Sequence, residues 1–151
     1  MITIEQEIAV DAPAGTVFAA VVDLRGYGRW LIPSKAYAGT VEISSDPVTL
    51  GTTYVENGPS GVRHGTITEL DAPTTVVFHQ PMTMRPAVLG TIDITVRYTL
   101  TPAEQGVRVR RVVSVALPVP LRLARPVVVR QFRTESMRTL LALKAFAESR
   151  P

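Results

Sequence analysis

The hydrophobic residues near the end of the chain recur every three or four positions. They include Val129, Phe132, Leu140, Leu143 and Ala147. This spacing places apolar side chains on one face of a helix, and no Gly or Pro interrupts residues 127–149. Pro126 is suited to the first helical turn, where its missing N–H is not needed. The pattern therefore predicts one long amphipathic helix over residues 127–149.

Most of the remaining chain alternates between apolar and polar residues, which is typical of half-buried strands. The predicted strands cover residues 1–10, 39–45, 52–56, 62–70, 75–80, 89–100 and 107–117. Short turns separate most of them, so we expect consecutive strands to pair antiparallel. Two short helices are predicted after the first strand. One has Pro13 as its first residue, capped by Asp11 or Ala12, and the other holds residues 27–31.

One long helix that follows many strands favours an α+β architecture. Because the helix has a single apolar face, we expect the seven predicted strands to form a curved antiparallel sheet wrapped around it. The chain of 151 residues contains no repeat and no linker-like segment, which predicts a single domain over residues 1–151.

Composition narrows the classes of function. Hydrophobic residues make up 46% of the chain and charged residues 19%, which is typical of a globular protein rather than a disordered one. There is no Cys and there are only two His, so neither thiolate chemistry nor a metal site nor another cofactor is expected. No apolar stretch of about 18 residues is present and no signal-peptide pattern begins the chain, which predicts a cytoplasmic protein without a membrane span.

The net charge is only +3, although arginines are concentrated after residue 107. These arginines either form a solvated helix face and strand edge or contact an anionic ligand or surface. The sequence lacks the interleaved aromatic residues that single-stranded nucleic acid requires, so no nucleic-acid partner is expected.

Short motifs along the whole chain resemble a known superfamily. Residues 10–18, with the sequence VDAPAGTVF, resemble the start of the first helix in the START-like (SRPBCC) superfamily of polyketide cyclase/dehydrase and lipid-transport proteins. The order of the predicted elements is that of the superfamily's helix-grip fold. The other matching positions are Asp23, Tyr27 and Trp30, the turns around Gly51, Gly61 and Gly106, and the sequence LLALK at residues 140–144.

The resemblance implies a cavity between the curved sheet and the long helix. In this superfamily the cavity holds hydrophobic small molecules such as polyketides, lipids and sterols. It does not imply one activity, because the fold hosts cyclases, hydrolases, carriers and receptors. We therefore expect a monomer or homodimer that binds a hydrophobic small molecule.

The alternation of side chains along each strand predicts which groups face this cavity. Tyr54, His64 and Tyr98 are the candidate catalytic residues, since a histidine and a tyrosine on neighbouring strands could move protons in an aldol cyclisation or a dehydration. The alternative is that His64 and His79 are exposed or only hydrogen-bonded. Arg111 interrupts a row of valines, so it either anchors a ligand or lies at a β-bulge that turns it outward.

The full predicted ligand-binding set combines polar and apolar side chains. It contains Trp30, Tyr54, His64, His79, Met82, Met84, Tyr98, Arg111, Phe132, Ser136 and Met137. The opening is expected near Trp30, the turn at residues 57–61 and the loop at residues 82–89, where methionines would form an adaptable rim. Ordinary core packing is the alternative for Phe132 and Met137.

Three functions remain open from the sequence. The first is binding of a lipid- or polyketide-like molecule in the cavity. The second is a polyketide cyclase, aromatase or dehydratase that uses His64 and a cavity tyrosine as acid and base. The third is a partner-binding stress-response module, for which a filled cavity and a large exposed apolar patch are expected.

Overall fold

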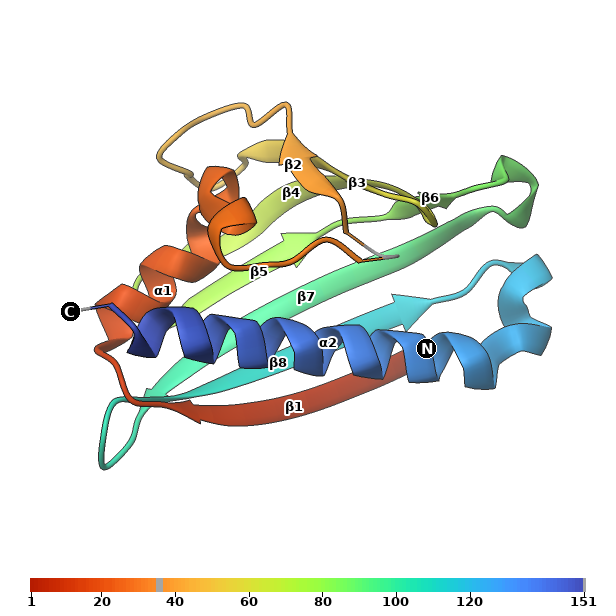
Figure 1. Ribbon diagram of the computed structural model, residues 1–151. Helices are drawn as coiled ribbons and strands as arrows, with labels where there is room; N and C mark the ends of the chain where they lie inside the picture. Colours follow the sequence, from red (N-terminus) through yellow and green to blue (C-terminus); the bar gives the residue numbers. More distant parts are fainter. Residues whose placement is uncertain (35–36, 151) are drawn as a thin grey trace.

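The computed structural model describes residues 1–34 and 37–150, and these contain eight strands in one antiparallel sheet and one long helix (Figure 1). The elements are β1 (Ile2–Val10), α1 (Ala14–Val22), the 3-10 helix η1 (Leu24–Arg29), β2 (Gly39–Val41), β3 (Thr53–Gly58), β4 (Gly61–Asp71), β5 (Thr75–His79), β6 (Met82–Met84), the 3-10 helix η2 (Ala87–Leu89), β7 (Thr91–Pro102), β8 (Val107–Ala116), the 3-10 helix η3 (Val119–Ala124) and α2 (Arg125–Glu148).

The sheet has the strand order β1-β8-β7-β5-β4-β3-β2, and β6 pairs with both β4 and β7. Figure 1 shows α2 lying across one face of the sheet, with α1 and η1 at one end of it. This arrangement confirms the predicted α+β helix-grip fold. The predicted long helix is also confirmed, and Pro126 lies in its first turn as expected.

The structure differs from the predicted elements at several boundaries. The eighth strand, β6, lies in the segment predicted as a loop, where Met82 pairs with Ile92. Pro81 and Pro86 flank this segment, so it is too short to show a periodicity of its own. The strand β2 covers only part of the predicted 39–45, and Pro13 is the N-cap of α1 rather than its first residue. The second short helix begins at Leu24 and is η1.

The C-terminal half of α2 closes the core. Leu140 and Leu143 are fully buried, and Ala147 is 1% exposed. This half packs on α1 and β1, where Val17 and Val21 of α1 are also fully buried. Two polar contacts also hold the C-terminal end of α2 against the end of β1. In the first, Lys144 Nζ donates to the carbonyl of Ala9 at 2.8 Å. The second contact joins the backbone N–H of Asp11 to Glu148 Oε2, also at 2.8 Å.

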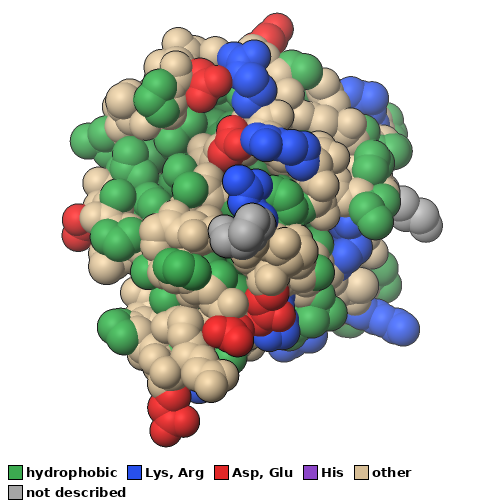
Figure 2. Space-filling view, turned by 60° about the vertical axis from the view of Figure 1, so that its left-hand side comes forward, with side chains coloured by type: hydrophobic (Ala, Val, Ile, Leu, Met, Phe, Trp, Pro, Cys, Tyr) green, Lys and Arg blue, Asp and Glu red, His purple; other side chains and the backbone are tan. Residues whose placement is uncertain are grey.

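The late arginines do not act as one group. Arg108 and Arg110 form ion pairs with Glu7 and Glu5 of the neighbouring strand β1, as expected for a solvated strand edge. Of the three arginines on β8, only Arg111 points into the interior. Figure 2 shows acidic and basic side chains mixed along the middle of one face of the molecule, with apolar side chains gathered to their left. Within residues 1–34 and 37–150, no helix has the length and apolar character needed to cross a membrane.

Candidate ligand-binding site

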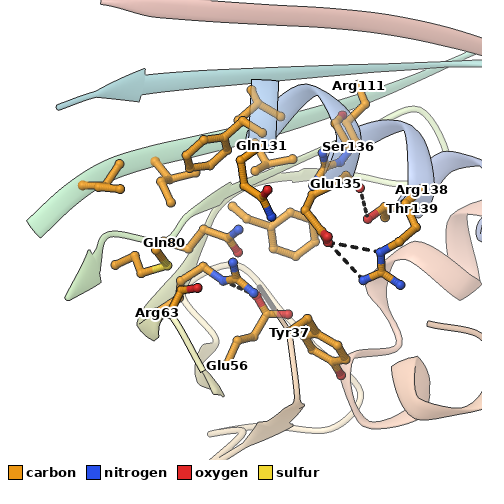
Figure 3. Close-up of a pocket in the computed structure, with 18 of the residues that line it drawn as sticks. Tyr37, Glu56, Arg63, Gln80, Arg111, Gln131, Glu135, Ser136, Arg138 and Thr139 are labelled. Atoms are coloured by element: carbon orange, nitrogen blue, oxygen red, sulfur yellow. Dashed lines mark hydrogen bonds and ion pairs between the residues drawn. The ribbon is translucent and has the colours of Figure 1, made fainter. Parts of the chain in front are cut away.

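A cavity of about 340 Å³ lies between the sheet and the N-terminal half of α2. It is lined by side chains from η1, β3, β4, β5, β6, β7, β8 and α2 (Figure 3). Most of its wall is apolar and includes Leu31, Phe78, Met82, Ile94, Val96 and Phe132. Apolar side chains around a concave site are typical of pockets that bind small molecules.

Strand alternation places these side chains. On β7 the buried positions alternate with exposed or half-buried ones, and Ile92, Ile94, Val96 and Tyr98 all face α2. Aromatic rings continue the wall across the sheet: Phe78 of β5 packs edge-to-face on Tyr98, with ring centroids 6.2 Å apart. The result is a wall of rings and branched side chains, whose order follows from the pairing of the strands.

Arg111 lies at the floor of the cavity, beside Tyr98. The two residues are paired partners on β8 and β7, and the pairing of these strands runs without a register shift. The predicted alternative of a β-bulge that turns Arg111 outward is therefore wrong. The Nε of Arg111 donates a hydrogen bond to Tyr98 Oη at 2.9 Å, and the guanidinium carbon lies 5.4 Å from the Tyr98 ring centre. This contact holds a positive charge against an aromatic face.

Two buried polar atoms near Arg111 have no hydrogen-bond partner among the described residues. One is the hydroxyl oxygen of Ser136, a cavity-lining residue that is 1% exposed. The other is Oε1 of Gln6. Gln6 is the paired partner of Arg111 on β1, and its Nε2 donates to the carbonyl of Arg133, three residues before Ser136. Gln6 therefore connects the strand that carries Arg111 with the helix that carries Ser136.

Tyrosines form much of the remaining polar lining. Tyr54 Oη donates to Gln80 Oε1 at 2.7 Å, and Tyr27 Oη donates to the carbonyl of Val21. Burial raises the pKa of both phenols well above the usual value, and the negative charge of Glu56 raises the pKa of Tyr54 further. Tyr54 and Tyr27 are therefore neutral hydrogen-bonding groups near pH 7 and cannot serve as bases there.

Two ion pairs lie on opposite sides of the cavity (Figure 3). On the sheet side, Arg63 Nε and Glu56 Oε1 are 3.1 Å apart, and both side chains are largely buried. On the helix side, Glu135 and Arg138 are 3.1 Å apart, and Arg138 also donates to the backbone carbonyl of Ile32 at 2.6 Å. The pairs contribute polar groups without adding net charge to the site.

The structure brings together seven of the predicted ligand-binding residues. The cavity is lined by Tyr54, Met82, Met84, Tyr98, Arg111, Phe132 and Ser136. Met137 lies on the same helix but does not line the cavity, because it follows Ser136 and is turned to another face of α2. Their predicted roles in binding or catalysis remain proposals.

Both histidines lie outside the cavity, contrary to prediction. His64 is exposed, and the cavity-facing neighbour on its strand is Arg63. His79 is partly exposed, and its Nε2 lies 2.7 Å from Asp93 Oδ1. The expected pairing of His64 with a cavity tyrosine is therefore wrong. The alternative, that both histidines are exposed or only hydrogen-bonded, describes their positions.

Trp30 also lies away from the cavity. Its ring stacks on Phe146 in the C-terminal half of α2, with ring centroids 6.3 Å apart, and it meets the edge of Tyr27 at 5.1 Å. Trp30 itself does not line the cavity, whereas Tyr27 and Leu31 of the same segment do. The other two parts of the predicted opening do contribute lining residues, Ser60 and Met84.

Sequence reasoning missed several polar lining residues. These are Tyr27, Tyr37, Glu56, Arg63, Gln80, Gln131, Glu135, Arg138 and Thr139. Strand alternation contained a signal for Glu56, which shares a face with Tyr54, and for Gln80, which shares one with Phe78. For both Glu56 and Arg111, a charged residue on an otherwise apolar strand face was the signal of a cavity-lining position. Within the described part of the chain, no cluster of three or more His, Asp or Glu side chains could hold a metal ion.

A family model described as polyketide cyclase/dehydrase and lipid transport matches residues 1–148. The chain belongs to this family. The superfamily resemblance of the short motifs is thereby confirmed. A comparison with curated proteins found no match.

Solved structures similar to this family member share its fold at low sequence identity. A protein from Mesorhizobium loti has 14% identity and a TM-score of 0.76, with 99% of each chain covered. The di-domain ARO/CYC BexL from the BE-7585A biosynthetic pathway has 18% identity and a TM-score of 0.76, covering 99% of this chain and 51% of that chain. The Aha1 dimer from Colwellia psychrerythraea has 20% identity and a TM-score of 0.68, covering 98% of this chain and 97% of that chain.

Proposed function

We propose that this protein binds one hydrophobic small molecule, of lipid-like or polyketide-like character, in the cavity between the sheet and α2. The observation that carries the proposal is the cavity itself, which has about 340 Å³ of space inside a largely apolar wall. Burial of an apolar molecule there would be favourable by roughly 25 cal/mol per Å² before the entropic costs of binding. Family membership supports the same class of ligand.

The polar lining would orient the molecule. Apolar contacts with residues such as Phe78, Val96 and Phe132 have no preferred direction, whereas hydrogen bonds do. The candidate groups are the tyrosines of the wall, Arg111 and Ser136. Met82 and Met84 are unbranched and adaptable, so they suit contacts with molecules of more than one shape.

Native mass spectrometry of gently purified protein tests this proposal. The expected result is a noncovalent adduct that disappears when the protein is denatured, with a mass that identifies a lipid- or polyketide-like molecule. Purification without an adduct, followed by no saturable binding of apolar probes in isothermal titration calorimetry, would contradict it. Trp30 is a poor reporter for such experiments, because it lies outside the cavity.

A second candidate function is cyclisation or dehydration of a polyketide. The likeness of the fold to the di-domain ARO/CYC BexL favours it. Tyr54 and Tyr27 are neutral at pH 7 and would not remove protons, and each already donates its phenolic proton, to Gln80 and to the carbonyl of Val21. Tyr98 accepts from Arg111, so its own proton would be the one donated to a substrate carbonyl oxygen. Incubation with a linear polyketide analogue and analysis by liquid chromatography tests this candidate. Binding without a new product would contradict this candidate and support ligand binding as the only function.

The partner-binding alternative has less support. It predicts that side chains fill the space between the sheet and the helix, whereas the cavity remains open on the side of α2 that carries Phe132 and Ser136. A pull-down alone would not decide between the functions. The relevant comparison is whether an apolar ligand and a protein partner compete.

A further inference from the structure

We propose that the ligand of this cavity carries a carboxylate, and that this group binds to Arg111 with help from Ser136. The inference rests on the proposed function, since it assigns the head group of the molecule that the cavity would hold. It makes the floor of the cavity an anion-binding subsite within an apolar site.

The first observation is the pairing of charges around the cavity. Glu56 is paired with Arg63, and Glu135 is paired with Arg138. Arg111 has no acidic partner among the described residues, and its hydrogen bond there runs from Nε to Tyr98 Oη. Its two terminal nitrogens, Nη1 and Nη2, have no partner in the described part of the chain. Arg111 is half-buried, and a cation partly withdrawn from water is stabilised by an anion or another acceptor.

The second observation is independent of charge. The hydroxyl of Ser136 is buried, faces the cavity and has no partner among the described residues. A buried hydroxyl without a hydrogen bond is unfavourable, and such groups are uncommon in folded proteins. Gln6 brings the two elements together, because it pairs with Arg111 and donates to the backbone of α2 one turn before Ser136. Figure 3 shows the labelled Arg111 and Ser136 at the same end of the cavity.

A carboxylate fits these donors. The two Nη groups of a guanidinium can bind both carboxylate oxygens in parallel, which is a strong and directional arrangement. Tyr98 Oη accepts from Arg111 and retains its own proton, so it can also donate to the bound oxygens. One arginine compensates the single charge of a carboxylate but would leave the higher charge of a phosphate monoester only partly compensated. The apolar wall suits a hydrocarbon or aromatic body behind this head group.

Matched acids and esters test the inference. Isothermal titration calorimetry should compare decanoate with methyl decanoate, and 2-naphthoate with methyl 2-naphthoate, at pH 7.5. We expect each acid to bind the wild-type protein at least about tenfold more tightly than its ester, as charge-assisted hydrogen bonds provide. Arg111→Gln should bring the ratio close to one without weakening the ester. Ser136→Ala should weaken only the acid, by severalfold.

Arg130→Gln is the matched control. It removes the same charge from an exposed position on α2 and should leave the acid-to-ester ratio unchanged. Esters that bind as tightly as acids would overturn the carboxylate assignment and leave the proposed function standing. Failure of all four probes to bind, together with no adduct in native mass spectrometry, would overturn both.

A second measurement uses the wild-type protein and needs no variant. The carbonyl ¹³C signal of decanoate labelled at C1 reports the pKa of the bound acid. Contact with the Arg111 guanidinium should lower this pKa below that of free decanoic acid. A bound pKa equal to or above the free value would overturn the inference, because an apolar environment without the guanidinium raises it.

Discussion

The two halves of α2 cross the same sheet but have different surroundings. The C-terminal half presents Leu140, Leu143 and Ala147 to α1 and β1, and these residues are fully or almost fully buried. The N-terminal half presents Phe132 and Ser136 to a cavity. The apolar spacing continues through both halves, so the helix itself does not determine the difference. The difference depends on what lies opposite, since α1 fills the space under only one half.

The two halves of α2 therefore contribute differently to the protein. The filled half supplies stability, because each apolar side chain there removes its surface from water and packs against neighbours on all sides. The hollow half keeps part of its apolar surface available for a ligand. An amphipathic pattern therefore predicts which face of a helix is covered but not whether protein atoms cover it completely.

The largest expected effect is in the filled half. Leu140→Ala should lower the free energy of unfolding by about 2–5 kcal/mol, because it leaves a void in a fully buried site. Phe132→Ala should cost less than half as much, since Phe132 is only partly buried and already borders a cavity. Urea unfolding monitored by circular dichroism measures both. Equal losses for the two variants would contradict the division of α2 into a filled and a hollow half.

A glycine substitution tests the wall of the hollow half. A Cβ at Gly65 would overlap the ring of Tyr54, which lies directly over this glycine on the neighbouring strand. Gly65→Ala should therefore displace Tyr54 and lower the free energy of unfolding by about 1–3 kcal/mol, as overpacking does. Ligand affinity should fall as well. Gly28→Ala is the control, because its Cβ would meet no atom within 4 Å. A Gly65→Ala protein with the stability and ligand affinity of the wild type would refute this contact.

Alkaline pH should destabilise the protein through the cavity tyrosines. The pKa of both Tyr27 and Tyr54 is raised in the folded state, mainly by burial, from an ordinary value of 10.0. Below about pH 10 both states keep these protons, so the stabilisation is fully present. As the pH rises above 10, the unfolded state loses the protons first, and the free energy of unfolding falls. Tyr54→Phe should reduce this pH dependence in denaturant unfolding, and an unchanged slope would count against the burial of Tyr54.

The smallest effect concerns the polar contact that fastens the filled half. The pKa of Glu148 is lowered because its carboxylate accepts hydrogen bonds from the backbone N–H of Asp11 and from Lys144. Its contribution to stability is present above its ordinary pKa of 4.5 and is lost as the pH falls through the lower folded value. Glu148→Gln should be slightly less stable at pH 7 and nearly equal to wild type at pH 3. A constant difference between these pH values would contradict the account.

The order of elements and the long helix were predictable because both leave strong local patterns. The same is true of Arg111, a charge in a row of valines, and of Tyr98, which shares the apolar face of its strand with Ile94 and Val96. The pattern of the helix extends over many residues, and Arg111 stands out because it interrupts a clear row of valines. The fold and part of the cavity floor could therefore be inferred from the sequence.

The assignment of β4 failed because its inward positions give little hydrophobic signal. The cavity side of this strand includes Arg63 and the glycine Gly65, while half-buried residues such as Val62 lie on the other side with His64. Apolar alternation thus favoured the wrong face. The position of Trp30 depends on the path of η1 and its stacking on Phe146, a contact between distant parts of the chain that no local pattern contains.

The methionine methyl groups offer the most direct test of ligand binding in the hollow half. Among the four methionines of the chain, Met82 and Met84 line the cavity, whereas Met1 and Met137 do not. Titration of ¹³C-methyl-methionine protein with decanoate should shift the Met82 and Met84 signals saturably and leave the Met1 and Met137 signals in place. Saturable shifts at Met137 without shifts at Met82 and Met84, or no shift at any methionine up to saturating probe, would contradict the assignment of the cavity as the binding site.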